Sequence, residues 1–316
     1  MEQRDNMICI VGPTASGKTA LSVRLAQVLG GEIVSFDSMQ VYRRMDIGTA
    51  KPTPEERCGV PHHMLDVADP AENYSVSRYV QEADACVQDI LSRGKLPVLV
   101  GGTGLYLDAL VRGNTFAAGQ QGGAIRQELQ ERLAREGAAA LLAELAAVDP
   151  ETAARLHLRD EKRILRALEV YRETGKTISE HDRKSREAPN RYDALYVGLS
   201  FQDRQDLRDR IDRRVDAMVA QGLLDEVRRL LDSGLPRDAT ALQAIGFKQF
   251  LAVADGTATE AEAVEEVKLR SRQYAKRQLT WLRRNPDIHW ILWEKEPDFP
   301  WALQNATDFL TAAGVC

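Results

Sequence analysis

The sequence MICIVGPTASGKT, which runs from Met7 to Thr19, decides the fold. Its first five residues are apolar, as in a buried strand, and the helical pattern that follows places Leu21 and Leu25 on one face. Between them lies a complete match to G-x-x-x-x-G-K-[ST], a loop whose backbone N–H groups turn toward phosphate oxygens. The N-terminus of the following helix adds its positive dipole end. The predicted phosphate ligands are Gly12, Pro13, Thr14, Ala15, Ser16, Gly17, Lys18 and Thr19, with the Thr19 hydroxyl placed for Mg²⁺.

Apolar runs and helical patterns alternate around this unit. The apolar runs predict strands at residues 7–11, 32–36, 63–67, 96–100, 195–199 and 288–293. Helical periodicity predicts helices at residues 18–29, 76–93, 204–231, 240–254 and 259–284. Buried strands separated by helices form parallel sheets with right-handed crossovers. We therefore predict an α/β fold, a P-loop NTPase-like parallel sheet flanked by helices.

The composition of the chain changes after residue 112. A Gly/Gln-rich connection at 117–123 leads into helical segments rich in Ala, Glu, Leu and Arg, which continue to about Lys184. This texture predicts an all-helical insertion domain. The expected organisation is a first part of the P-loop core at 1–112, the insertion at 113–190, and a continuation of the core with a basic C-terminal helix at 191–316.

Composition excludes several classes of protein. The chain has 316 residues, a net charge of −5 and four scattered cysteines, which argues against a disulfide framework or a zinc site. The first six residues lack the pattern of a signal peptide, and no apolar run approaches the roughly 20 residues that span a bilayer. We expect a soluble, cytoplasmic protein with no membrane partner, acting as a monomer.

One segment carries strong positive charge on this acidic chain. Residues 268–284, KLRSRQYAKRQLTWLRR, contain seven basic residues and no acidic one. Helical spacing places Arg270, Gln273, Arg277, Trp281 and Arg284 on one face. An acid-free basic helix indicates contact with a polyanion such as RNA, whereas a solvated amphipathic helix would usually mix acids with bases.

The acid expected of an ordinary NTPase is missing. The strand at 96–100 ends in Gly101-Gly102-Thr103-Gly104, where an NTPase would place an Asp that holds Mg²⁺. Asp37 instead follows the second strand, within the ligand crevice of an open α/β sheet. It is either a turn residue or a carboxylate that acts as general base or metal contact.

Five blocks of the chain, taken together, resemble one known family. They are GPTASGKT (12–19), DSMQVYRRMDIGTAKP (37–52), VGGTGLYLDAL (100–110), RALEVYRETG (166–175) and RQYAKRQLTWLRR (272–284). In this order they are similar to the tRNA dimethylallyltransferase family, also called tRNA isopentenyltransferases, in its bacterial form without the C-terminal zinc finger of eukaryotic relatives.

The resemblance implies an enzyme that transfers a dimethylallyl group from dimethylallyl diphosphate to N6 of the adenosine just 3′ of the anticodon. The partner would be the tRNA anticodon stem-loop, in tRNAs that read codons beginning with U, and the cofactor Mg²⁺. The phosphate loop would then hold the leaving diphosphate. By resemblance, Asp37 is the general base, Thr103 bonds near the reacting amine, and Arg214 is directed at the diphosphate. From the residues alone, the alternative for Thr103 is a turn residue and that for Arg214 is part of a solvated helix face.

The resemblance also implies a set of tRNA contacts. Asp37, Ser38, Met39 and Gln40 would meet the extracted adenine, together with Thr103. The other implied contacts are Arg126, Lys162, Arg163, Arg166, Gln243, Gly246, Phe247, Lys248, Arg272, Gln273, Lys276, Arg277, Gln278, Thr280, Trp281 and Arg283.

Two other functions remain open from the residues. A P-loop small-molecule kinase or NTPase would turn over ATP, and a non-enzymatic RNA-binding protein could use a nucleotide as a switch. The His62-His63 doublet resembles a pair of metal ligands, but we predict that it is structural. Adjacent residues on a strand point to opposite faces, and no third ligand is near in the sequence.

Overall fold

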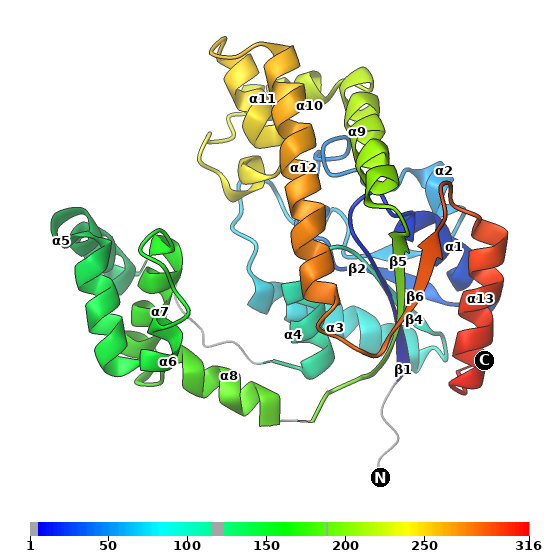
Figure 1. Cartoon of the computed structure of the whole chain (residues 1–316), viewed down its shortest axis with the longest axis horizontal. Helices are drawn as coiled ribbons and strands as arrows, with labels where there is room; N and C mark the ends of the chain where they lie inside the picture. The colour runs from blue at the N-terminus through cyan, green and yellow to red at the C-terminus, as the bar shows by residue number, and fades with distance from the viewer. Residues whose placement is uncertain (1–5, 115–122, 188, 316) are drawn as a thin grey trace. The chain divides into compact units, whose positions relative to one another are not determined.

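The computed structural model describes residues 6–114, 123–187 and 189–315 (Figure 1). The chain divides into two compact units. The first unit joins Met1–Val111 to Arg191–Cys316, and the second consists of Arg112–Asn190.

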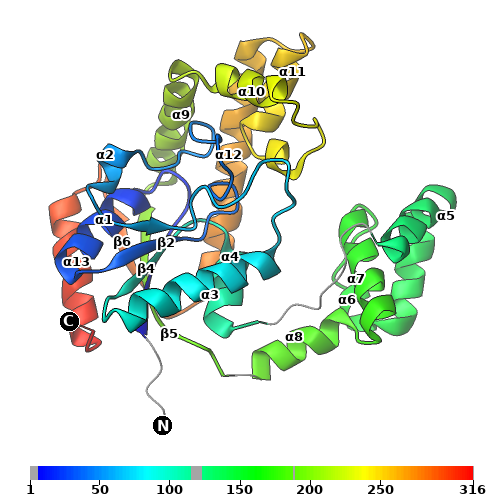
Figure 2. The same ribbon diagram turned by 180° about the vertical axis from the view of Figure 1, so that it is seen from behind.

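The first unit is built on a six-stranded, fully parallel sheet with strand order β3-β2-β4-β1-β5-β6. Figures 1 and 2 show it from opposite sides. The strands are β1 (Asn6–Val11), β2 (Glu32–Ser35), β3 (His62–His63), β4 (Pro97–Val100), β5 (Asp193–Phe201) and β6 (Ile288–Trp293). The predicted α/β class is confirmed, and β1, which enters the phosphate loop, lies inside the sheet between β4 and β5.

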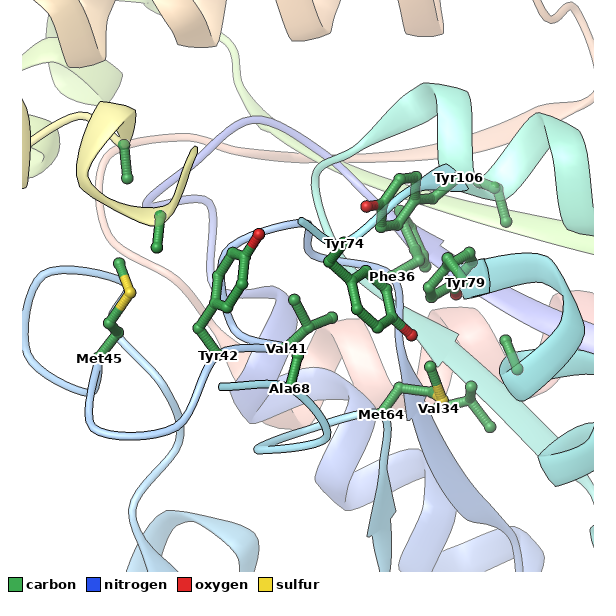
Figure 3. Close-up of a cluster of buried hydrophobic side chains, with 14 of the residues drawn as sticks. Val34, Phe36, Val41, Tyr42, Met45, Met64, Ala68, Tyr74, Tyr79 and Tyr106 are labelled. Atoms are coloured by element: carbon green, nitrogen blue, oxygen red, sulfur yellow. The ribbon is translucent and has the colours of Figure 1, made fainter. Parts of the chain in front are cut away.

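A hydrophobic core covers each face of the sheet, and the side chains of β1 point alternately into one core and the other. Ile8 and Ile10 pack with α1 (Lys18–Leu29) and α13 (Phe299–Ala312). Met7 and Cys9 pack with α3 (Val76–Ser92), α4 (Gly104–Arg112) and α12 (Glu260–Leu282). The core that contains Met7 and Cys9 also holds a group of buried tyrosines, among them Tyr42, in the segment that follows β2, and Tyr79 on α3 (Figure 3).

The third predicted strand was wrong in its extent. Residues 63–67 were expected to be extended, but the strand ends at His63. Met64 has a φ of 64° and Asp66 a φ of 58°, and this left-handed backbone cannot continue a strand. His63 Nε2 donates to the Glu32 carboxylate at 2.8 Å and His62 contacts the Val60 carbonyl, so both rings have structural partners.

Two predicted helices are each divided in the structure. The segment 204–231 forms α9 (Arg204–Ala220) and α10 (Leu223–Asp232), because Gly222 between them adopts a φ of 98°. The segment 240–254 forms the short 3₁₀ helix η1 (Thr240–Gln243) and α11 (Phe247–Ala254). In both segments the apolar spacing continues past the break, so the sequence predicts one helix where the structure has two.

Three helices of the first unit had no counterpart in the predicted list: α2 (Pro54–Arg57), α4 and α13. Proline occupies the start of both α2 and α13, where its missing N–H costs no hydrogen bond. Helix α12 begins at a capping box in which the Thr259 hydroxyl and the Glu262 carboxylate each accept a backbone N–H from the other residue.

The second unit is helical in its described residues. It contains α5 (Ala124–Val148), α6 (Pro150–Ala153), α7 (Glu161–Thr174) and α8 (Ile178–Glu187), and α5 is interrupted at Gly137. Its core is formed by Leu129, Leu141, Leu145 and residues of α7. The Gly/Gln-rich connection at 117–123 lies outside the described residues, apart from Gly123.

No helix in the described parts of the chain is both long and apolar enough to cross a membrane.

Replacement of Glu32 by glutamine should destabilise the first unit. Glu32 is a buried carboxylate that accepts hydrogen bonds from Arg93 and from Lys95, with His63 as a third partner. The bonds from Arg93, followed by those from Lys95 and His63, hold the pKa of Glu32 far below its ordinary value against the effect of burial. Because charge-assisted bonds contribute about 1.5–3 kcal/mol each and the partners can regain water, we expect a loss of about 2–3 kcal/mol at pH 7.

The pH dependence fixes the sign of this prediction. A depressed folded-state pKa gives stability that is present above the unfolded pKa, near 4.5, and is lost as the pH falls below it. The difference between wild type and Glu32→Gln in thermal unfolding should therefore shrink in acid. Asp89→Asn is the control, since Asp89 binds the same Arg93 from the surface and its loss should cost little. Equal losses in the two variants would contradict the prediction.

Candidate active site

The phosphate-binding loop between β1 and α1 is held by bonds to its carbonyl groups. The Ser16 carbonyl accepts from the Trp293 indole at 2.8 Å, and the Ala15 carbonyl accepts from Arg210 at 3.2 Å. Gly12 has a φ of 152°, and a Cβ there would collide with the Leu199 carbonyl oxygen. With its carbonyls directed to β6 and α9, the loop presents the N-terminus of α1, where the first amides have no intrahelical acceptor.

Lys18 lies over this loop. Its ammonium group donates to the Gly12 carbonyl at 3.0 Å and to the Pro13 carbonyl at 2.8 Å. Burial, and next the positive charge of Arg214, lower the pKa of Lys18 to about 7, while Asp37 acts in the opposite direction. Lys18 is therefore closer to neutrality in the free protein than a lysine in water, and a bound anion would favour its charged form.

Diphosphate binding should become weaker as the pH rises above 7. With a pKa of about 7 in the free protein, Lys18 must take up a proton to bind an anion at higher pH, so that the affinity falls by up to about ten-fold per pH unit. Calorimetry of inorganic diphosphate binding in buffers of different ionisation enthalpy measures this uptake. Lys18→Arg is the comparison, because its side chain stays charged at these pH values. Ionisation of the ligand contributes equally in both proteins, so binding to the variant should take up about one proton fewer than binding to the wild type. An identical pH dependence in both proteins would contradict the prediction.

Asp37 lies just beyond the end of β2, and its two carboxylate oxygens have different surroundings. Its Oδ1 accepts from the N–H groups of Met39 at 2.9 Å and Gln40 at 3.4 Å, which is the turn that Asp-Ser favours. Its charge also acts on the surrounding groups: after burial, it is the next cause that raises the pKa of Tyr274, to about 12. Oδ2 has no hydrogen bond to any residue that the structure describes. A turn formed by Oδ1 is thus compatible with proton transfer at Oδ2.

The loop after β4 bonds directly to the Asp37 segment. The Thr103 N–H donates to the Phe36 carbonyl at 3.3 Å, and the Thr103 hydroxyl accepts from the Ser38 N–H at 3.0 Å. The same hydroxyl lies 3.2 Å from the Ser38 hydroxyl. Thr103 therefore orders the residues after Asp37, which is more than a plain turn residue does.

Helix α12 joins this loop to the phosphate loop. The buried amide of Gln278 accepts from the Thr14 N–H at 2.9 Å and donates to the Gly102 carbonyl at 2.9 Å. Tyr274 donates to the same carbonyl at 3.1 Å. Both side chains line the cavity described below, and the tRNA contact implied for Gln278 stays a prediction. The helical pattern could not show this, because the contacts come from segments more than 160 residues away.

Arg214 on α9 completes the cluster of charges. Its guanidinium donates to the Thr14 hydroxyl at 3.2 Å, and burial lowers its pKa. Among the described residues Arg214 forms no salt bridge, whereas Arg210 and Arg213 on the same helix both pair with Glu296. The solvated-face alternative for Arg214 is thus wrong, and its charge faces the phosphate loop.

A cavity of about 1050 Å³ in the first unit gathers these groups at the carboxyl ends of β1, β2 and β4. Thr103, Ser38 and Met39 are not among the residues that line it. Of the predicted residues, the lining includes Thr14, Ala15, Ser16, Gly17, Lys18, Thr19, Asp37, Gln40, Arg214 and Gln278; it adds Lys51, Glu56, Arg210, Tyr274 and Phe299, which the sequence did not suggest.

The basic helix α12 is less charged than its sequence implied. Lys268 pairs with Asp216, Arg270 with Glu266 and Arg272 with Asp212. The indole of Trp281 donates to Asp108 at 3.1 Å and packs on Gly104, so it is half-buried. Of the predicted contacts on this helix and just past its end, the exposed ones are Gln273, Lys276, Arg277, Thr280 and Arg283.

The remaining predicted tRNA contacts are placed differently from one another. Gln243 and Lys248 are exposed, but Gly246 and Phe247 are buried. Gln40 is also engaged: its amide donates to the carbonyls at 49 and 50 at 3.2 Å. Their roles toward tRNA stay predictions.

In the second unit, Lys162 and Arg163 are exposed on α7. Arg166 pairs with the buried Glu169 at 2.9 Å, and Arg126 approaches the same carboxylate at 3.7 Å. A shared buried acid therefore holds two of the predicted contacts together.

Known protein families match the chain along most of its length. A family model described as IPP transferase matches residues 40–285, and one described as isopentenyl transferase matches residues 5–71. The tRNA dimethylallyltransferase of Geobacter sulfurreducens is 50% identical over 288 residues, which cover 91% of this chain and 92% of the relative. That of Bacillus subtilis is 46% identical, with 90% of each chain covered.

Solved structures agree with these matches. The tRNA isopentenylpyrophosphate transferase of Bacillus halodurans is 41% identical, with a TM-score of 0.73, and the match covers 98% of this chain and 96% of that one. A eukaryotic dimethylallyltransferase captured acting on tRNA is 31% identical, with a TM-score of 0.82, and covers 98% of this chain and 80% of that one. The parallel sheet, the cavity beside the phosphate loop and these matches agree, and the chain belongs to the tRNA dimethylallyltransferase family.

Proposed function

We propose that the protein transfers a dimethylallyl group from dimethylallyl diphosphate to N6 of the adenosine immediately 3′ of the anticodon, tRNA position 37. The substrates would be tRNAs that read codons beginning with U, and the product N6-(dimethylallyl)adenosine. The observation that carries the proposal is one cavity, lined by the phosphate loop, Lys18, Arg214 and Asp37, that places cations for a leaving diphosphate beside a carboxylate.

The cationic side of the cavity suits the leaving group. As the allylic C–O bond breaks, its electron pair leaves with the diphosphate, and negative charge accumulates there. Lys18 and Arg214 both contact the loop near Thr14, one bonded to the Pro13 carbonyl and the other to the Thr14 hydroxyl. Fixed cations at this position stabilise the developing charge without having to reorganise.

The carboxylate side suits the acceptor. Adenine N6 is a weak nucleophile, because its lone pair is delocalised into the ring. When N6 bonds to the allylic carbon it becomes cationic and must lose one proton, which Asp37 Oδ2 can accept. Thr103 and Ser38 fix the backbone beyond Asp37 through their mutual bonds, so that the carboxylate keeps one orientation.

Mg²⁺ is the proposed cofactor, and the donor groups present fit it. The Thr19 hydroxyl in the first turn of α1 would supply one oxygen, and diphosphate oxygens and water would supply the others, as is usual for this ion. When bound, the ion neutralises part of the charge on the leaving group.

Transfer requires the adenine to leave the anticodon-loop stack. The exposed Lys276, Arg277 and Arg283 on and just beyond α12 form no salt bridge with any described residue, so they can pair with phosphates. We propose the anticodon stem-loop as the partner, a monomeric enzyme, and the cytoplasm as its location.

One assay tests the proposal. The protein is incubated with dimethylallyl diphosphate, Mg²⁺ and unmodified tRNA, and the tRNA is digested and analysed by mass spectrometry. We expect one C₅H₈ unit on the adenosine at position 37 and none on a tRNA with guanosine there. Consumption of ATP without any modified adenosine would instead support a P-loop kinase or NTPase and overturn the proposal.

A further inference from the structure

Glu226 is a buried carboxylate that lies outside the cavity. It comes from α10, and its two oxygens accept three consecutive backbone N–H groups: those of Asp46 and Ile47 at 2.8 Å each, and that of Gly48 at 2.9 Å. Glu226 forms no salt bridge with the described residues, and its charge is compensated by the three amide dipoles and by its place in the first turn of α10. The bonds hold the chain at 46–48 against α10.

The segment that Glu226 holds forms a wall of the cavity. Asp46, Ile47, Thr49, Ala50 and Lys51 all line it. Beyond the amides held by Glu226, the carbonyls of Thr49 and Ala50 accept hydrogen bonds from the Gln40 side chain at 3.2 Å each. Glu226 thus holds the first part of the segment at 46–50, and Gln40 holds its last two residues.

Gln40 connects this segment to Asp37 through hydrogen bonds. The Gln40 N–H donates to Asp37 Oδ1 at 3.4 Å, and the Gln40 side-chain oxygen accepts from the Ser35 hydroxyl, which in turn accepts from the Asp37 N–H at 3.4 Å. Hydrogen bonds, together with the backbone between Gly48 and Thr49, therefore connect α10 to the carboxylate in the cavity.

The packing around Gly48 leaves the segment little room on the side of α10 and α11. A Cβ on Gly48 would collide with the Phe247 ring and would lie 2.9 Å from Leu223, so the backbone at Gly48 lies directly against α10 and α11. The Lys51 end is anchored by its buried ammonium, which donates to Asp66 at 2.6 Å and to the Tyr42 carbonyl at 2.8 Å. The same ammonium pairs with the Asp46 carboxylate at 2.6 Å, so Lys51 and Glu226 both hold the start of the segment. Loss of Glu226 would then leave the amides of Asp46, Ile47 and Gly48 without their acceptor, while the Lys51 contacts remain.

We propose that Glu226 is a positioning residue for the transfer reaction: acting through residues 46–50 and Gln40, it fixes the orientation of the Asp37 carboxylate. The inference rests on the proposed function in that Asp37 is taken as the base. Glu226 does not line the cavity and acts only through the segment that it holds.

The test compares Glu226→Gln with Asp225→Asn in the full-length protein. The glutamine keeps the volume but has one oxygen where the carboxylate has two, so that one or two of the three amides lose their acceptor. Asp225 is the neighbouring, exposed acid of the same helix and pairs only with Arg228 at 3.4 Å among the described residues. Glu226→Gln should lower the single-turnover rate by at least about ten-fold, since small misplacement of a reacting group is costly, with diphosphate affinity changed less than about two-fold. Asp225→Asn should change neither.

A second measurement does not depend on activity. Hydrogen exchange of the peptide spanning 37–41 reports the Met39 and Gln40 amides that bond to Asp37. In Glu226→Gln these amides should exchange faster, and in Asp225→Asn they should not. This result separates the inference from the proposed function: if the wild type transferred nothing, unchanged exchange would still overturn the positioning role and faster exchange would support it.

The coupling is checked by combining variants. Gln40→Met removes the near end of this connection, so adding Glu226→Gln should slow the reaction further by less than about three-fold. Should Glu226→Gln fail to fold, Glu226→Asp keeps the charge on a shorter arm and should show the same pattern at smaller size. Full additivity in the double variant, or an unchanged rate and exchange in folded Glu226 variants, would overturn the proposal.

Discussion

Asp37→Asn should lower the single-turnover rate of dimethylallyl transfer by about 10²–10⁴-fold, the usual contribution of a general base. The asparagine oxygen can still accept from the Met39 and Gln40 amides, so the turn and the melting temperature should be retained. What is lost is the carboxylate that takes the N6 proton. Quenched-flow measurement with saturating tRNA and donor gives the rate directly.

The charge change makes this prediction sharper. Asp37 is an anion beside Lys18 and Arg214, so its removal makes the cavity more positive and should leave donor binding as tight or tighter. The affinity for tRNA should stay within about two-fold in a filter-binding assay, because one carboxylate contributes little to phosphate-dominated binding. Asp37→Ala serves as the comparison, since it loses the turn as well and should also melt earlier. An asparagine variant that keeps more than a tenth of the wild-type rate would reduce Asp37 to a turn residue.

Arg214→Gln should lower the transfer rate by about 10²–10³-fold, comparable to the removal of one preorganised donor from an anion-stabilising site. Arg214 is bonded to Thr14 and carries a charge without a carboxylate partner among the described residues. The diphosphate gains negative charge as the bond to carbon breaks, so the cation should matter more in the transition state than in the bound donor. The turnover number should therefore fall by more than the donor KM rises.

Arg208→Gln is the matched control for this prediction. Arg208 lies on the same helix, is exposed, and does not line the cavity. It should behave as wild type, and Arg214→Lys should recover only part of the rate, because an ammonium on a different stem cannot reproduce the guanidinium geometry. A loss confined to donor KM, with an unchanged turnover number, would make Arg214 a binding residue only.

The phosphate loop and the sheet could be predicted because their signals are local. The pattern from Gly12 to Thr19 requires a tight turn between a buried strand and a helix, and the structure contains β1 and α1 at the predicted residues. The strand at 288–293 was predicted at its observed bounds from its apolar run. Errors occurred where one residue changed the backbone: Met64 ends β3, and Gly222 divides a helix whose apolar spacing continues past it.

The electrostatics of α12 show why charge counting along the chain fails. The segment 268–284 contains no acid, yet Asp212 and Asp216 on α9 neutralise Arg272 and Lys268. These partners lie more than 50 residues away and meet the helix only through packing. The surface open to a polyanion is therefore smaller than the sequence implies, and Trp281 is committed to Asp108 and Gly104.

By itself the sequence determined the fold class, the phosphate loop and the resemblance to a family, because each depends on residues that are near neighbours in the chain. It also singled out Asp37, Thr103 and Arg214 through that resemblance. Only the tertiary structure decided how they are held: Gln278 bridging two loops, and Glu226 holding the wall beside Asp37. A polar group can be buried at low cost only where hydrogen-bond partners surround it, and those partners become neighbours only when the chain folds.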